Sequence, residues 1–257
     1  MRAQTLPSAA GWRWLASGFL IYRRNPPMMS MLVLAYWLTV VFLNLFPVIG
    51  ALAAAVAVPG LSVGLMQAAR NLERGLPVNL ATLFGSFREN ARALMALGAL
   101  YLLCSLGALA ASALIDGGDL FHFMLAGSRS ERALVEDADF TGSALLVMLL
   151  MVPVLMAWWF APVLAAWHRL SLGRSLFFSF VACWMNWRPF LNYSVALLVL
   201  SVLLPGVLVA LVLVVLPGLS EFMFAIIMVP MILVAAPVIF ASFYACYRDI
   251  FGISEIV

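Results

Sequence analysis

Charged residues are scarce in this sequence. They make up 10% of its 257 residues, whereas an ordinary globular domain has about 25%. Hydrophobic residues account for 66%, which is more apolar surface than a soluble core of this size can bury. Lysine is absent, and no run of Arg is dense enough to follow a phosphate backbone. The composition therefore excludes an ordinary soluble domain and argues against a nucleic-acid partner.

Residues that hold metals or carry out redox chemistry are also few. Cys104, Cys183 and Cys246 lie in or beside apolar stretches and form no CxxC pair, so we expect buried thiols that pack as small hydrophobic groups. The acidic segment 116–142 offers carboxylates but lacks the alternating spacing of a calcium loop. No nucleophile with a nearby base stands out. The sequence therefore predicts no metal, no cofactor and no enzymatic activity.

The residues that are present form long apolar stretches between short charged clusters. A stretch of about 18 or more apolar residues can cross the ~30 Å hydrocarbon core as a helix. The first stretch, 25–69, is long enough for two crossings, and Phe46–Gly50 contains the turn signals that divide it. We predict an all-α polytopic protein with one integral membrane domain, 1–257. The six predicted spans are 28–46, 48–69, 93–115, 143–167, 190–216 and 222–246.

The basic residues divide unequally between the two sides of these spans. Alternate segments place twelve of the fourteen Arg, with four acids, on one side, and two Arg with seven acids on the other. Because short Arg-rich loops stay in the cytoplasm, we predict that both termini are cytoplasmic. His122 and His168 then lie on opposite sides of the membrane and cannot form one site.

Three cytoplasmic segments share a pattern anchored on Asn25, Asn90 and Asn186. A Phe lies six residues before each Asn and a Leu ten residues before it, offsets that fall on one helical face. We predict amphipathic interfacial helices over 10–24, 77–90 and 171–186, each leading into a pair of spans in a threefold repeat. The residues expected to contact lipid or a partner are Leu15, Phe19, Leu80, Phe84, Leu176, Phe180, Arg23, Arg24, Arg88, Arg92 and Arg188.

No ionisable residue lies in the middle of a predicted span, which argues against a proton-coupled or voltage-driven carrier. Prolines interrupt several spans, and interrupted helices can mark transporter binding sites. In the fourth span, Pro153 and Pro162 flank Trp158 and Trp159. This span is the best candidate for one that lines a cavity.

Several motifs together resemble a proteobacterial family of inner-membrane proteins of unknown function. They are Gly11-Trp12-x-Trp14-Leu15-Ala16-x-Gly18-Phe19, Arg23-Arg24-Asn25-Pro26, Asn186-Trp187-Arg188-Pro189-Phe190 and Tyr247-Arg248-Asp249-Ile250-Phe251. The resemblance covers nearly the whole chain and implies a bacterial inner-membrane location. The layout is more distantly similar to the membrane domain fused to some glycerophosphodiester phosphodiesterases. Their catalytic domain has no counterpart in this sequence, so that activity is not implied.

Two functional classes remain open from the sequence. The favoured interpretation is a non-enzymatic scaffold, or envelope-organising factor, that acts through membrane lipids and through a membrane-protein partner or a second copy of the chain. The alternative is a permease or exporter of a lipid-like or small apolar solute that works without ion coupling. The alternative requires a cavity beside the fourth and fifth spans, and a solidly packed midplane would remove its support.

Overall fold

The computed structural model describes residues 3–46, 49–126, 138–215 and 221–252, and every regular element in these ranges is a helix. In chain order they are α1 (Ala10–Tyr22), α2 (Pro26–Asn44), α3 (Ile49–Glu73), α4 (Ala81–Gly85), α5 (Phe87–Asp116), α6 (Asp119–Ala126), α8 (Ala138–Trp158), α9 (Ala161–Trp167), α10 (Leu172–Met185), α11 (Trp187–Leu198), the π-helical turn η1 (Val199–Leu203), α12 (Leu204–Val215) and α13 (Glu221–Phe251).

Six helical segments in the described ranges are long and apolar enough to cross a membrane, which confirms the predicted all-helical, six-span class. They are Pro26–Asn44, Ile49–Glu73, Asn90–Asp116, Asp139–Trp167, Trp187–Val212 and Met231–Phe251. The second and sixth continue past their predicted ends at 69 and 246. Backbone hydrogen bonding carries a helix on after its apolar stretch ends, and here the added turns bring Glu73 and Arg248 into an ion pair.

A break in the helical backbone occurs at each asparagine that anchors the sequence pattern. Asn25 has φ −154° and ψ 77°, Asn90 has φ −154° and ψ 58°, and Asn186 has φ −112° and ψ 27°. The Asn25 side chain accepts a hydrogen bond from the Met28 backbone N–H, which is an N-cap. In each case a short helical segment ends and a span begins at or next to the asparagine.

The middle short helix is smaller than the predicted range 77–90. Helix α4 covers only Ala81–Gly85, and the chain from Gly75 to Asn79 is not helical. The Asn79 side chain accepts from the backbone N–H of Thr82 at 3.1 Å, so it fixes the start of the helix there. Asparagine competes with the helical backbone in this way, which explains the shorter element.

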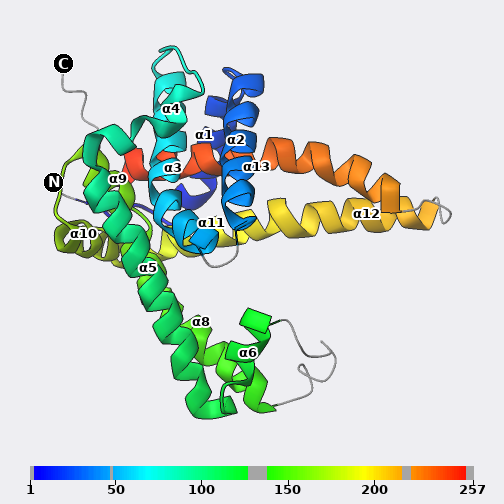
Figure 1. Ribbon diagram of the computed structural model, residues 1–257. Helices are drawn as coiled ribbons and strands as arrows, with labels where there is room; N and C mark the ends of the chain where they lie inside the picture. The colour runs from blue at the N-terminus through cyan, green and yellow to red at the C-terminus, as the bar shows by residue number, and fades with distance from the viewer. Residues whose placement is uncertain (1–2, 47–48, 127–137, 216–220, 253–257) are drawn as a thin grey trace.

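The helices form one body with two projecting hairpins (Figure 1). Helices α1, α2, α3 and α9 and the C-terminal part of α13 gather in the body. One projection consists of α5 and α8 with α6 near its tip, and the other consists of α12 with the first part of α13. The two ends of the described chain meet on the body, because the Gln4 N–H donates to the Ile250 carbonyl at 2.8 Å.

Helix α1 packs inside the body between α11 and α13. A Cβ atom placed on Gly18 would lie 2.6 Å from the Val238 carbonyl oxygen and 2.7 Å from the Ser242 nitrogen, so the two backbones are in close contact. Trp14 is fully buried, and Leu15 is 7% exposed. Helix α1 therefore makes extensive contacts with other helices in addition to any contact with lipid.

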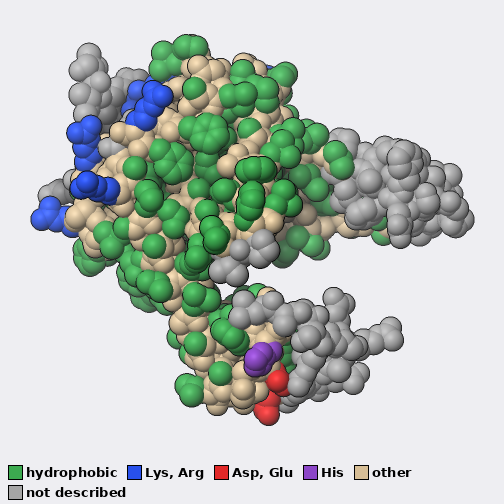
Figure 2. Space-filling model, viewed as in Figure 1, with side chains coloured by type: hydrophobic (Ala, Val, Ile, Leu, Met, Phe, Trp, Pro, Cys, Tyr) green, Lys and Arg blue, Asp and Glu red, His purple; other side chains and the backbone are tan. Residues whose placement is uncertain are grey.

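Charge is segregated along the molecule. On the face shown in Figure 2, Arg side chains gather at one end of the body, and the acidic and histidine side chains lie near the tip of the α5–α8 projection. The tip includes Asp119 and His122 of α6. We call the first of these regions the Arg-rich end.

Candidate functional site

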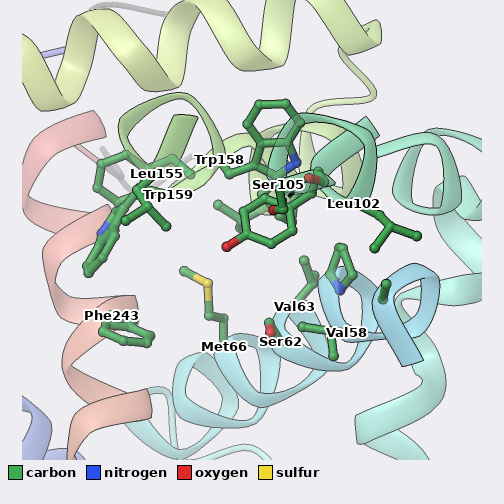
Figure 3. A pocket seen from close by; sticks show the side chains of 16 residues that line it. Val58, Ser62, Val63, Met66, Leu102, Ser105, Leu155, Trp158, Trp159 and Phe243 are labelled. Atoms are coloured by element: carbon green, nitrogen blue, oxygen red, sulfur yellow. Dashed lines mark hydrogen bonds between the residues drawn. The ribbon is translucent and has the colours of Figure 1, made fainter. Parts of the chain in front are cut away.

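A cavity of about 500 Å³ lies against the fourth span, where α3, α5, α9 and α13 meet. Figure 3 shows Val58, Ser62 and Met66 on one side of it and Trp158 and Ser105 on the opposite side, with Trp159 and Phe243 at one end. Leu155 also lines it and is 47% exposed, so the cavity reaches the outside of the protein there. Its size falls within the range of small-molecule sites.

A break in the fourth span shapes this cavity. Helix α8 ends at Trp158 and α9 begins at Ala161. Pro162 lies in the first turn of α9, where its missing N–H costs least. The Ser179 hydroxyl accepts from the Phe160 N–H at 2.9 Å and donates to the Met156 carbonyl at 2.8 Å, so it satisfies backbone groups that the break exposes.

Trp158, Trp159 and Pro162 of the candidate fourth span all line the cavity, whereas Pro153 is not among the lining residues. The neighbouring elements differ from those required by the carrier interpretation: the lining comes from the second, third and sixth spans rather than the fifth. The Trp158 indole N–H donates to the Leu97 carbonyl at 3.0 Å, which fixes one wall of the cavity to α5.

The described lining of the cavity contains no ionisable acid or base apart from the phenol of Tyr101. Its other hydroxyls belong to Ser62 and Ser105, and Ser105 already donates to the Tyr101 carbonyl of its own helix at 2.9 Å. A site with this lining suits an apolar molecule held mainly by contact area.

Folding also brings together a charged cluster at the C-terminal ends of α3 and α13. Arg248 of α13 forms ion pairs with Glu73 of α3 and with the adjacent Asp249. The Tyr244 hydroxyl donates to Glu73 at 2.7 Å. Arg24, which follows α1, donates to the carbonyls of Leu72 and Glu73 at the end of α3, where helix carbonyls lack intrahelical partners; the Leu72 carbonyl also accepts from the Gly75 N–H at 3.2 Å. This cluster joins the ends of the second and sixth spans.

Arg70 lies one helical turn before Glu73, in different surroundings. Its guanidinium carbon lies 4.8 Å from the centre of the Trp167 ring, a cation–π contact, and its Nε atom is buried with no hydrogen-bond partner. Nearby, the His168 Nε2 atom is 2.6 Å from the Tyr247 hydroxyl. Partial burial of its ring and the positive charge of Arg70 lower the pKa of His168, which favours its neutral form.

Arg70, Glu73 and Arg248 carry no sequence signal that identifies them as a group. Glu73 and Arg248 are 175 residues apart, and each has the appearance of an ordinary flanking charge. One sequence feature relates the two arginines: Arg70 follows Pro59 by eleven residues, and Arg248 follows Pro237 by the same interval. This interval places both Arg at equivalent ends of their spans. It could not show that α3 and α13 lie side by side.

The residues predicted to contact lipid or a partner occupy three kinds of position. Phe19, Leu80 and Phe84 are about half exposed, Leu176 and Phe180 are partly buried, and Leu15 is buried in the core. The predicted arginines are all exposed: Arg23, Arg24, Arg88, Arg92 and Arg188. The fold therefore does not bring these residues into one site.

Leu15 and Phe19 line a second apolar hollow, of about 610 Å³, between α1, the fifth span and α13. Its other walls include Leu200, Leu204 and Met231. It lies beside the π-helical turn η1, where the extra backbone residue of the wider turn displaces the helix face. Its described lining contains no polar side chain other than Trp12.

The cysteines are free, and Cys183 and Cys246 are buried, in agreement with the expected role as small hydrophobic groups. Burial raises the pKa of the Cys183 thiol to about 12, so it stays protonated and unreactive. The described residues contain no group of three potential metal ligands. Glu131, Glu136 and Asp137 of the acidic segment lie outside the described residues.

Six long apolar helices, an apolar cavity between them and arginines gathered at one end define a polytopic α-helical membrane protein. The sequence is 34% identical over 262 residues to a probable inner membrane protein of Burkholderia thailandensis, an alignment that covers 99% of this chain and 96% of that protein. The chain belongs to the same family as that protein. No protein-family model and no solved structure matches it, so the more distant likeness to a phosphodiesterase-linked membrane domain stays a prediction.

Proposed function

We propose that this protein is a non-enzymatic, uncoupled carrier that binds a lipid-like apolar molecule in the cavity beside its fourth span. The cavity itself is the observation that favours a carrier over a scaffold, because a scaffold needs no such space in its core. Burial of apolar surface provides about 25 cal/mol per Å², so a lining of Trp, Leu, Val and Met side chains favours acyl or isoprenoid groups over polar solutes.

We propose transport without ion coupling, because no carboxylate, lysine or histidine contributes to the described lining of the cavity. Ion- and proton-coupled transporters place ionisable groups within the membrane. The charged cluster of Glu73, Arg248 and Asp249 is internally paired, which supports a structural role rather than a catalytic one. Membrane lipids are therefore the partners that this proposal requires.

Filling the cavity provides the test. In Ser62→Phe, the new ring would occupy space that the ligand uses, so we expect at least a tenfold loss of retained lipid, equivalent to about 1.4 kcal/mol. Native mass spectrometry of protein purified in mild detergent measures the retained lipid. The matched control is Ser194→Phe, since Ser194 is exposed on the fifth span.

A carrier should also speed the transfer of a fluorescent single-chain lipid across reconstituted vesicles, at a rate that an imposed pH gradient does not alter. Equal lipid retention and equal transfer in Ser62→Phe and wild type would contradict the carrier and favour the scaffold. In the scaffold interpretation the exposed Phe19 and Phe84 and the surrounding arginines act through a membrane-protein partner or a second copy of the chain.

We further propose that the protein lies in the bacterial inner membrane with both termini in the cytoplasm. The name of the Burkholderia relative supports the location, and the gathering of Arg side chains at one end supports the orientation. A periplasm-active reporter inserted after Ala126, near the tip of the α5–α8 projection, should be active. The same reporter inserted after Gly75 should be inactive, and the reverse pattern would contradict the orientation.

The threefold repeat with interfacial helices belongs to the same proposal. The three asparagine breaks support it. So does the packing, because each short helix contacts the second span of the preceding unit in cyclic order: α1 on α13, α4 on α3, and α10 on α8 and α9. An experimental structure in which the three units cannot be superposed would contradict the repeat.

A further inference from the structure

Three helices that line the cavity each carry, four residues after a lining residue, a residue of a second cluster. On α3 the lining residues Pro59, Ser62, Val63 and Met66 form one helical stripe, and Arg70 is the next residue on it. The same step of four residues leads from Val163 to Trp167 on α9 and from Phe243 to Tyr247 on α13.

These next residues contact one another in a single layer above the cavity. The Arg70 guanidinium lies over Trp167 at 4.8 Å, and the Trp167 and Tyr247 rings are 5.2 Å apart. His168 joins the layer through its hydrogen bond with Tyr247. Arg70, Trp167 and Tyr247 do not line the cavity themselves, but each lies one helical turn beyond a lining residue, so a layer of aromatic rings with one guanidinium group lies next to the apolar cavity.

The guanidinium of Arg70 is only partly satisfied. In the described part of the chain, the buried side-chain nitrogens without a hydrogen-bond partner are Arg70 Nε and Trp14 Nε1. An unsatisfied buried donor costs about 1–3 kcal/mol, and more when it is charged. The nearest acid along α3, Glu73, is already bound to Arg248 and Tyr244. The charge and the free donor together favour a negatively charged ligand group.

The dimensions favour one acyl chain. A methylene group occupies about as much space as a water molecule, roughly 30 Å³, so the cavity of about 500 Å³ holds on the order of fifteen of them. From Ala55, at the far end of the lining on α3, to Arg70 the helix rises about 22 Å. That is about the thickness of one leaflet with its headgroup region.

We propose that the cavity binds a long-chain fatty acid whose carboxylate pairs with the guanidinium of Arg70. This inference rests on the proposed function, because it identifies the ligand of the same cavity. A carboxylate matches the planar fork of donors on Arg, and its single negative charge matches the positive charge of Arg70. The acyl chain then runs from Arg70 past Met66 and Ser62 toward the middle of the membrane.

The test compares an acid with its neutral ester. Wild-type protein in nanodiscs of phosphatidylcholine is exposed to a photoreactive diazirine derivative of palmitic acid or to the methyl ester of that derivative, and labelled peptides are mapped by mass spectrometry. We expect the acid to label α3 and α9 and palmitate to compete with this labelling. The apparent affinity of the acid should be at least tenfold higher than that of the ester. Arg70→Gln should remove this preference while ester labelling stays within twofold, and Arg74→Gln, an exposed neighbour on the same chain segment, should retain it.

Each contrary result has a separate meaning. Equal labelling of the wild type by acid and ester overturns the role of Arg70 but leaves the carrier intact, and this comparison requires no variant to fold. Stronger competition by lysophosphatidylglycerol than by palmitate overturns the fatty-acid assignment. If neither compound labels the cavity residues, the proposed function fails along with this inference. Retention of the acid preference in Arg70→Lys supports the charge pairing, since lysine keeps the positive charge.

Discussion

Replacing Gly18 by alanine should strongly destabilise the protein, although alanine is the better helix former by about 1 kcal/mol. The new Cβ atom would lie 2.6 Å from the Val238 carbonyl oxygen and 2.7 Å from the Ser242 nitrogen. Both are backbone atoms of α13, so relief requires α1 and α13 to separate. Overpacking of this kind costs about 1–3 kcal/mol, which corresponds to a fall in Tm of several degrees for a chain of this size.

The measurement is thermal unfolding in detergent, followed by circular dichroism and by the monodisperse fraction. Gly107→Ala is the matched control, because a Cβ atom at this position in α5 meets no atom within 4 Å. It should leave the Tm unchanged or raise it slightly. Equal Tm values for Gly18→Ala and Gly107→Ala would contradict the close contact between Gly18 of α1 and the backbone of α13.

Removing the charge of Arg248 should produce the second large effect. Its partners Glu73 and Asp249 are partly buried, with side-chain exposures of 24% and 31%, so solvent screens the ion pairs incompletely. In Arg248→Gln the Glu73 carboxylate would lose its ion pair and keep its hydrogen bond from Tyr244. Hydrogen bonds to charged groups contribute about 1.5–3 kcal/mol, and we discount this to about 1–2 kcal/mol because the pair is partly exposed.

A double-mutant cycle separates this ion pair from other effects. Glu73→Gln alone should destabilise by a similar amount, and the double variant should be less destabilised than the sum of the two, because the pair can be lost only once. Arg174→Gln is the control, since Arg174 is exposed on α10. Strict additivity of Arg248→Gln and Glu73→Gln would mean that the two side chains do not interact.

The pairing of Glu73 with Arg248 also shows how far sequence reasoning reaches. Hydropathy placed the first five spans within about four residues of those in the structure, because a helix that crosses lipid must be apolar over a fixed length. The sixth spanning segment begins at Met231 rather than at 222. The asparagine pattern located the three breaks that precede spans. Neither signal states which spans are neighbours, so the contact between α3 and α13 was not predictable.

Helix α1 is a similar case. Its Phe and Leu positions predicted a helix on the membrane surface, and the structure places Leu15 and Trp14 in the core between α11 and α13. The cause is the small residues on the same face, Gly11 and Gly18, which allow close approach of other backbones. A glycine in a sequence does not reveal whether another helix lies against it.

The sequence by itself determined the all-helical class, the number of crossings and the segregation of Arg, because these follow from the cost of placing polar groups and charges in hydrocarbon. It also identified Trp158, Trp159 and Pro162 as residues of interest. Only the tertiary structure decided that these residues enclose a cavity with α3, α5 and α13, and that Arg70 lies in the layer above it. Lipid covers apolar side chains on any face of a span, so hydropathy cannot choose between neighbours, and that choice depends on shape and close packing between helices.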